Sequence, residues 1–358
     1  MLYSQNPVKK LRVFAIAAGI AAITLAFGTP LKSQTMEEII AGAKKEGEVR
    51  IAITVRKKEG DIVAAPRLIE AFQKKYPFVK VHHNRIGGSR ERQRLFTELV
   101  SGMVSYDVAT LGQDAVPDGI KAGIFRKVDW KGLGVSLERY HPEGIGVTYR
   151  TQLYGMSYNT NKLSKAEAEK LTWESCADPR FKGQIAYNVR PRHLEILYQN
   201  DAWGEKKTLE HARKIKENKP IFNRDRTGMQ TRLAGGAYTF VCGQFWSTHQ
   251  RAVLGEGVKN LGFVVPNPAL ISGGDFVFVP KGAKNPYAAI LWIHWSISEE
   301  GLNLLDEVQF TGDPTLPGAT SYGMLKNKKV IRGSWEYQTR ASQILRSILA
   351  TMGMPVAR

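Results

Sequence analysis

Arginine and lysine side chains recur where the expected strands end and the expected helices begin. A guanidinium group suits a carboxylate or phosphate because its N–H groups bind two oxygens of such an anion at once. Taken singly, most of these residues are also typical of a solvated surface. As a set, they predict a site for a small anion. The basic and polar candidates are Arg56, Lys57, Arg85, Arg190, Arg192, His193, Arg226 and Thr227.

Glycines, aromatic residues and one acid add to this candidate site. The turn at residues 87–89 precedes an expected helix, and free backbone N–H groups at a helix start can hold an anion. The aromatic pair at 245–246 can stack on a planar or apolar part of the ligand. Asp275 either caps a turn or contacts the ligand, and the sequence leaves this choice open. The further candidates are Gly88, Ser89, Gly112, Phe245, Trp246 and Asp275.

Known catalytic and metal-binding motifs are missing from the sequence. It contains no HExxH, GxSxG, GxxxxGK[ST] or CxxC pattern. The neighbours His82 and His83 fall in an expected strand, where successive side chains point to opposite faces. We therefore predict no catalytic residue, no metal ligand and no cofactor. A secreted enzyme is kept as an alternative that turnover of an anion would reveal.

The net charge is strongly positive, because 51 Lys and Arg outnumber 33 Asp and Glu to give +18. The basic residues are spread along the chain in short runs. This distribution is typical of a solvated basic surface, and it also suits a field that attracts anionic ligands. Nucleic acid, the usual partner of a basic cytosolic protein, is not predicted because the N-terminus indicates export.

The first 33 residues have the pattern of a secretory signal peptide. Lys9, Lys10 and Arg12 form a basic start, and residues 13–28 are free of charge. This apolar run is short for a membrane span, although an uncleaved anchor is the alternative. Export places the chain in an oxidising compartment. There Cys176 and Cys242 can form one disulfide, but the sequence does not show that they meet.

Strands alternating with helices begin the mature chain. Strands are expected at 48–55, 78–82 and 106–110, with helices between them, which predicts a parallel α/β sheet. Ligands bind beyond the carboxyl ends of such strands, here segments 56–59, 84–89 and 111–114. A second unit follows. Its expected features include a pair of crossing strands at 147–158 and strands at 263–266 and 275–279 that return to the first unit.

Three stretches resemble bacterial extracellular solute-binding proteins. Residues 173–186 (WESCADPRFKGQIA) are similar to a family segment that runs through Asp-Pro and Lys-Gly into a short strand. Residues 154–162 (YGMSYNTNK) resemble its crossing strand. Residues 281–289 (KGAKNPYAA) resemble the start of its late helix. The similarity covers the whole mature chain, and the nearest branch includes ferric-iron-binding proteins.

The resemblance implies a two-lobe periplasmic-binding-protein fold of type II, α/β in class, with crossing strands as the hinge. The lobes are then expected at 36–147 plus 263–310 and at 148–262 plus 311–358. A monomeric periplasmic receptor is implied, which closes on its solute and delivers it to the membrane permease of an ABC importer. The expected solute is a carboxylate, phosphonate or phosphate ester.

Ferric iron or an iron chelate is the alternative ligand. The ferric branch holds its metal with a His, a Glu and two consecutive Tyr residues. Here segment 56–61 contains no His, Leu111-Gly112 stands where the acid would lie, and Phe245-Trp246 stands in place of the Tyr pair. Neither aromatic ring can donate an oxygen to iron. This departure favours the anionic solute.

Overall fold

The computed structural model describes residues 34–355 except 56–57, 60–61 and 88. The predicted signal peptide lies outside the described residues. Among those that are described, no helix is both long and apolar enough to cross a membrane. The described chain folds into two α/β lobes, each with its own sheet and core.

The first lobe is built on a five-stranded sheet in the order β4-β1-β5-β13-β6. Strand β1 pairs in parallel with β4 and β5, as the alternating pattern predicted, while β13 runs antiparallel to β5 and β6. The strands are β1 (Glu48–Ile53), β4 (Lys80–Arg85), β5 (Val108–Leu111), β6 (Val147–Tyr149) and β13 (Asp275–Phe278), with β2 (Lys58–Glu59) and β3 (Ile62–Val63) as a separate small pair.

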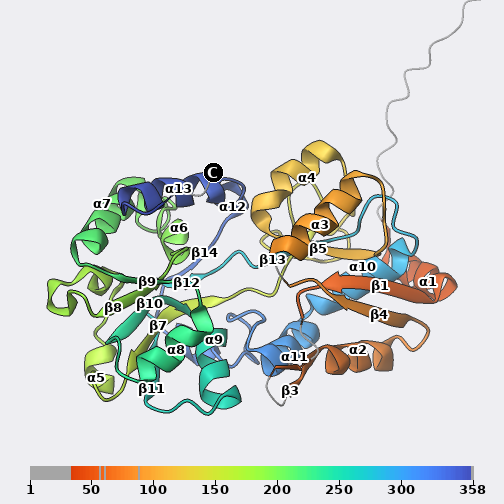
Figure 1. The fold of residues 1–358 in the computed structure, drawn as a ribbon. Coiled ribbons are helices and arrows are strands. Elements are labelled where there is room, and N and C mark those ends of the chain that lie inside the picture. Colours follow the sequence, from red (N-terminus) through yellow and green to blue (C-terminus); the bar gives the residue numbers. More distant parts are fainter. Residues whose placement is uncertain (1–33, 56–57, 60–61, 88, 356–358) are drawn as a thin grey trace, which may run out of the picture. The chain divides into compact units, whose positions relative to one another are not determined.

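The helices of this lobe pack with the sheet through buried apolar side chains. On α2, Phe72 is fully buried and packs edge-on against Trp292 and Trp295, which are also buried. Helices α2 and α11 lie side by side (Figure 1). The helices are α1 (Met36–Glu46), α2 (Ala64–Lys75), α3 (Ser89–Val100), α4 (Val116–Ala122), α10 (Pro286–Ser296) and α11 (Glu299–Gln309).

The second lobe is built on a mixed sheet in the order β14-β12-β7-β10-β8-β9, with β11 also paired to β7. The strands are β7 (Leu153–Asn159), β8 (Ile185–Asn188), β9 (Ile221–Asn223), β10 (Phe240–Phe245), β11 (Leu261–Val264), β12 (Ala269–Ile271) and β14 (Val330–Arg332). Its helices are α5 (Lys165–Ala168), α6 (His193–Leu197), α7 (Gly204–Glu217), α8 (Arg226–Ala234), α9 (Trp246–Gln250), α12 (Trp335–Thr339) and α13 (Ala341–Thr351).

The strand predicted to return to the first lobe at 263–266 stays in the second lobe instead. Strand β11 pairs with residues 156–159 of β7, and β12 pairs with 153–154. Their apolar side chains, including Phe263 and Ile271, pack in a cluster with Leu153 of β7. The return therefore comes later, at β13. The other predicted lobe limits stay predictions.

The described chain passes between the two sheets three times, twice through short segments. Residues 150–152 join β6 of the first sheet to β7 of the second, which agrees with the crossing strands predicted at 147–158. Residues 272–274 join β12 back to β13. A third segment lies against the first, since the backbone N–H of Thr151 donates to the carbonyl of Gly312 (2.9 Å).

Cys176 and Cys242 form a disulfide, with their Cα atoms 5.9 Å apart. It joins the 3₁₀ turn η2 (Trp173–Ala177) to the central strand β10. The question that the sequence left open is thus answered by the fold, which brings together two residues that are 66 positions apart.

Candidate ligand-binding site

A cavity of about 320 Å³ lies where the crossing segments meet residues of both lobes. This volume falls at the lower end of the range for small-molecule sites, about 300–1,000 Å³. Polar and apolar residues both line it. The charged residues on its wall are Arg92, Asp114, Arg150, Arg192, Glu195 and Asp275.

Asp275, the first residue of β13, is the centre of one charged cluster. Its Oδ2 accepts hydrogen bonds from Thr54 Oγ1 (2.7 Å) and Arg150 Nε (2.9 Å), and its Oδ1 accepts from Arg92 Nη2 (3.3 Å). Burial alone would raise the pKa of Asp275, but Arg150 and Arg92 outweigh it and lower that pKa. Asp275 is therefore an anion shared by two guanidinium groups.

The backbone beside this cluster takes a conformation that favours glycine. Gly274 has φ of +76°, and a Cβ there would lie 2.8 Å from the carbonyl oxygen of Tyr149. Arg150 itself has φ of 54°, in the left-handed region. The two crossing segments thus approach each other closely, which aims Arg150 at Asp275.

Arg192 and Glu195 come from the start of α6 in the second lobe and face Asp114 of the first lobe. Arg192 Nη2 lies 3.9 Å from Asp114 Oδ2, and Arg192 Nη1 lies 3.8 Å from Glu195 Oε2. Both carboxylates raise the pKa of Arg192, Glu195 more than Asp114. These distances are too long for hydrogen bonds. The guanidinium of Arg192 therefore keeps N–H donors that a ligand can use.

Glu195 is in a different electrostatic state from Asp275. Burial raises its pKa to about 7, even though the nearby Arg192 lowers it. In the described part of the chain, its Oε1 is buried without a hydrogen-bond partner. A carboxyl with one weak ion pair and an unpartnered oxygen is held in the neutral form more readily than a hydrogen-bonded one.

Two aromatic rings form the apolar side of the cavity. The rings of Tyr154 on β7 and Phe245 on β10 lie 4.6 Å apart. The guanidinium of Arg226, the first residue of α8, lies 4.6 Å from the Phe245 ring. Arg226 donates to the carbonyls of Gly243 and Arg190, both at 3.3 Å. Burial raises the pKa of Tyr154 and lowers that of Arg226. The Tyr154 phenol is thus neutral, and the Arg226 guanidinium lies behind the Phe245 ring.

Glutamine side chains connect the remaining walls. Gln113 donates to the carbonyl of Gly273, and Gln338 to that of Gly333. Gln152 accepts a hydrogen bond from Ser247 Oγ (2.6 Å). These glutamines lie on the cavity wall and come from the segment after β5, from a crossing segment and from α12.

Four of the candidates from the sequence lie on the cavity wall: Gly112, Arg192, Phe245 and Asp275. Whether they contact a solute stays a prediction. Arg56, Lys57 and Gly88 lie outside the described residues, as does the side chain of Ser89. The candidates that the structure places elsewhere than on this wall are Arg85, Arg190, His193, Arg226, Thr227 and Trp246.

At the 87–89 turn, which was predicted to hold an anion, and at the start of α8, carboxylates of the chain accept backbone hydrogen bonds. At α8, the backbone N–H of Thr227 donates to Asp225 Oδ1 (3.1 Å), which caps the helix. At α3, the N–H of Gly87 donates to Glu91 Oε2 (2.6 Å). Each of these hydrogen bonds uses one backbone donor that an anion would otherwise accept from.

His193 and Trp246 are core residues. His193 is only 1% exposed and lies behind the cavity wall. Trp246 packs on the rings of His249 and Phe263, and its Nε1 donates to Thr320 Oγ1 (3.0 Å). Of the aromatic pair predicted to stack on a ligand, only Phe245 faces the cavity.

Several wall residues escaped the sequence-based search. Arg92 lies within α3, Arg150 in a crossing segment and Glu195 within α6, so none of them stands at the strand ends and helix starts from which the sequence predicts a site. Tyr337 and Gln338 come from α12, near the end of the chain. Asp114 stood in a segment that the strand-end rule had nominated, but its side chain was not selected.

A family model described as bacterial extracellular solute-binding protein matches residues 67–330, about three quarters of the chain. The chain belongs to this family, which confirms the resemblance found in its motifs. It is thus a solute-binding protein of the kind that serves ABC transporters, and members of this family are binding proteins.

Two relatives show how far the sequence similarity extends. An uncharacterized protein of Haemophilus influenzae is 27% identical over 203 residues, which make up 53% of this chain and 58% of that protein. The match therefore spans less than two thirds of that relative. The putrescine-binding periplasmic protein SpuD of Pseudomonas aeruginosa is 22% identical over 320 residues, covering 79% of this chain and 84% of SpuD.

Solved structures share the two-lobe fold. Iron-bound HitA from Pseudomonas aeruginosa superposes with a TM-score of 0.65 at 14% identity, covering 85% of this chain and 99% of HitA. The Trichodesmium protein FutA, solved with iron and citrate, superposes with a TM-score of 0.68 at 17% identity, covering 86% of this chain and 100% of FutA. These likenesses confirm the predicted fold class.

Proposed function

We propose that this protein captures a small anionic solute in the described cavity and delivers it to the membrane permease of an ABC importer. The solute is a carboxylate, phosphonate or phosphate ester, and capture takes place in the periplasm after export. The observation that carries this proposal is Arg192, whose guanidinium faces the cavity with ion pairs at 3.8 and 3.9 Å and no hydrogen bond to either carboxylate.

The charges around the cavity support an anion. Two guanidinium groups share the single carboxylate of Asp275, and Arg192 stands between Asp114 and Glu195. Behind the Phe245 ring, Arg226 is a further cation, which contacts two carbonyls and that aromatic ring. Three carboxyl groups and three guanidinium groups thus line the cavity, and the pKa of one of the carboxyls, Glu195, is about 7. When Glu195 is protonated, the wall carries an excess of positive charge. An incoming anion balances the excess.

The shape of the cavity supports a solute that also has an apolar or planar part. Tyr154 and Phe245 line the cavity together with the charged cluster of Asp275. Aromatic faces bind flat or apolar groups favourably. A phosphate ester or carboxylate with a short ring or chain would contact both the charged and the aromatic residues of the cavity.

A thermal-shift screen of the mature protein tests this proposal. The anions are acetate, succinate, benzoate, phosphate, ethylphosphonate and phenyl phosphate, and the comparison ligands are putrescine, sucrose, ferric chloride and ferric citrate. Anions should raise the melting temperature, since a ligand at 100 times its Kd stabilises the folded state by about 2.7 kcal/mol. Stabilisation confined to putrescine, sucrose or ferric ion would overturn the anion preference.

A matched pair of variants locates the binding. Arg192→Gln should remove the stabilisation by anions, because it removes the guanidinium that faces the cavity. Arg213→Gln replaces an exposed arginine on α7 of the same lobe and should leave the stabilisation intact. An equal loss in both variants would show that the anions act through surface charge alone. Recovery of a chemically altered solute would indicate a secreted enzyme instead.

A further inference from the structure

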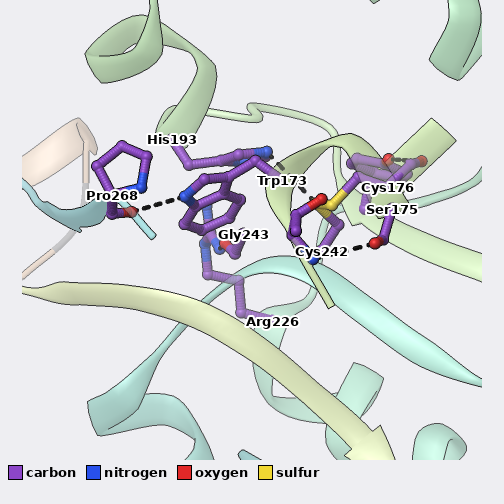
Figure 2. The surroundings of a disulfide bond; sticks show 10 residues. Trp173, Ser175, Cys176, His193, Arg226, Cys242, Gly243 and Pro268 are labelled. Carbon is purple, nitrogen blue, oxygen red and sulfur yellow. Dashed lines mark hydrogen bonds between the residues drawn. A yellow bond between two sulfur atoms is a disulfide. The ribbon is translucent and has the colours of Figure 1, made fainter. Parts of the chain in front are cut away.

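His193 lies behind the cavity wall, enclosed by aromatic rings and the disulfide. Its ring stacks on Trp173, with centroids 5.4 Å apart, and lies 6.4 Å from the ring of Tyr187. Figure 2 shows His193 and Trp173 beside the bridge between Cys176 and Cys242. His193 Nε2 is 3.6 Å from Cys242 Sγ. The imidazole is therefore part of a packed layer that no solute reaches directly.

This ring occupies the space that a side chain at Gly243 would need. A Cβ at Gly243 would lie 2.0 Å from His193 Nδ1, and Gly243 has φ of +67°. The pairing of β10 with β7 shifts register between Cys242 and Gln244, which makes Gly243 the extra residue of a β-bulge. Such bulges re-aim the side chains that follow them. Here the bulge sets the direction of Phe245, two residues further on.

The same histidine starts α6, the helix that carries the charged part of the wall. Arg192 immediately precedes it, and Glu195 follows on the same short helix. Arg226 holds the other side of the bulge by donating to the carbonyl of Gly243 (3.3 Å). His193 therefore connects the two parts of the chain that present groups to the cavity. It belongs to the helix next to Arg192, and its ring packs against the bulge before Phe245.

Burial keeps the ring uncharged. It lowers the pKa of His193 to about 3, assisted by His211 and Arg226. In the described part of the chain, His193 Nδ1 has no hydrogen-bond partner. What the residue supplies is thus the shape of its ring rather than a charge or a hydrogen bond to the solute.

We propose that His193 is the positioning residue of the solute site: its ring, wedged against the bulge at Gly243, fixes Arg192 relative to Phe245. This role rests on the proposed function for its consequence in binding, but the positions of the two side chains can be measured without any solute.

Crystal structures of two matched variants test the positioning directly. His193→Ala should displace Arg192 and Phe245 from their places in the parent protein. His211→Ala is the control for the loss of a buried imidazole in the same region. His211 is close enough to lower the pKa of His193, but it packs edge-on against Trp203, and burial lowers its own pKa to about 4. This control should leave both side chains in place. Unmoved Arg192 and Phe245 in His193→Ala would refute the proposal.

Binding of phenyl phosphate, measured by calorimetry well below the melting temperature, gives the functional readout. His193→Ala should weaken it at least about tenfold, or 1.4 kcal/mol, while His211→Ala should leave it within about twofold. Equal weakening in both variants would show a merely structural role. If the parent protein binds neither phenyl phosphate nor any other anion, the proposed function fails, and the crystal structures still decide the positioning role.

A double-mutant cycle with Gly243→Ala separates the wedge from a general loss of stability. Alone, Gly243→Ala should lower both stability and binding, because the new methyl group collides with the ring. In the His193→Ala background the collision is gone, so the same change should cost less. Additive effects would contradict the contact. Should His193→Ala fail to fold, His193→Asn is the milder replacement that also leaves the ring's space empty.

Discussion

Two carboxylates in this protein are each held by two arginines, yet one cluster is closed and the other is open to the cavity. Asp313 is fully buried; Oδ1 accepts from Arg332 Nη2 (2.6 Å) and from the N–H and hydroxyl of Thr315, while Oδ2 accepts from Arg139. Asp275 keeps 12% of its side chain exposed, and Arg92 reaches it only at 3.3 Å.

The two clusters differ in how many arginine N–H donors remain available to a ligand. In both clusters burial is outweighed by arginines, which lower the pKa of Asp313 and of Asp275. Two arginines and a threonine surround the Asp313 carboxylate, which does not line the cavity. This carboxylate joins Arg139 of the first lobe to Arg332 on β14 of the second. At Asp275 the arginines face the cavity. The same residue types thus make a structural joint in one place and a candidate anion site in the other.

The largest loss of stability is expected from a change in the closed cluster, at Asp313. Asp313→Asn keeps the shape of the side chain but leaves Arg139 and Arg332 without a counter-charge. Breaking a buried ion pair from one side typically costs about 3–5 kcal/mol. Urea unfolding followed by circular dichroism should show a loss of this size. A variant as stable as the parent would mean that Asp313 is not the joint between the lobes.

Glu195 extends the comparison to a carboxyl without any hydrogen bond to its arginine. Its pKa is raised from the ordinary 4.5 to about 7, so the folded protein binds its proton more tightly than the unfolded chain does. Stability should therefore fall as the pH rises from about 4.5 to 7 and level off above, by at most about 3 kcal/mol. The charged groups facing it are Arg192, Asp114, Arg190 and Arg226.

Glu195→Gln should remove this part of the pH dependence, because an amide does not titrate. Denaturant unfolding at a series of pH values would measure it in both proteins. If the parent and the variant show parallel curves between pH 4.5 and 7, burial does not hold the Glu195 proton as described.

At the open cluster, Asp275→Asn should have a smaller cost in stability and a gain in binding. Loss of the carboxylate removes about 1–3 kcal/mol of buried hydrogen bonding, but it frees Arg92 and Arg150 for an incoming anion. Affinity for phenyl phosphate should then rise several-fold in calorimetry. Unchanged or weaker binding would show that these arginines do not reach the solute.

The smallest effects come from the two threonines that support the clusters. Thr54→Val removes one hydrogen bond to Asp275, and Thr315→Val removes the hydroxyl that contacts both Asp313 and Arg332. We expect losses of about 1 kcal/mol for Thr54→Val and somewhat more for Thr315→Val. Thermal melts of the two variants would compare them. The reverse order would contradict the view that the Asp313 cluster is the more tightly bonded one.

The local pattern of the sequence determined the class of fold and part of the site. Alternation of strands and helices predicted the parallel part of the first sheet, and the rule of strand ends led to Gly112 on the cavity wall. The motif at 173–186 led to the family. These inferences succeeded because periodicity and turn residues act over a few neighbouring positions.

The tertiary structure alone decided which charges meet. Arg92, Arg150 and Asp275 are far apart in the sequence, and the crossing of the two connecting segments brings them together. It also turned His193 inward and left Arg192, its neighbour, facing the cavity. Charge pairing and burial depend on distances across the whole fold, so no short stretch of sequence contains them.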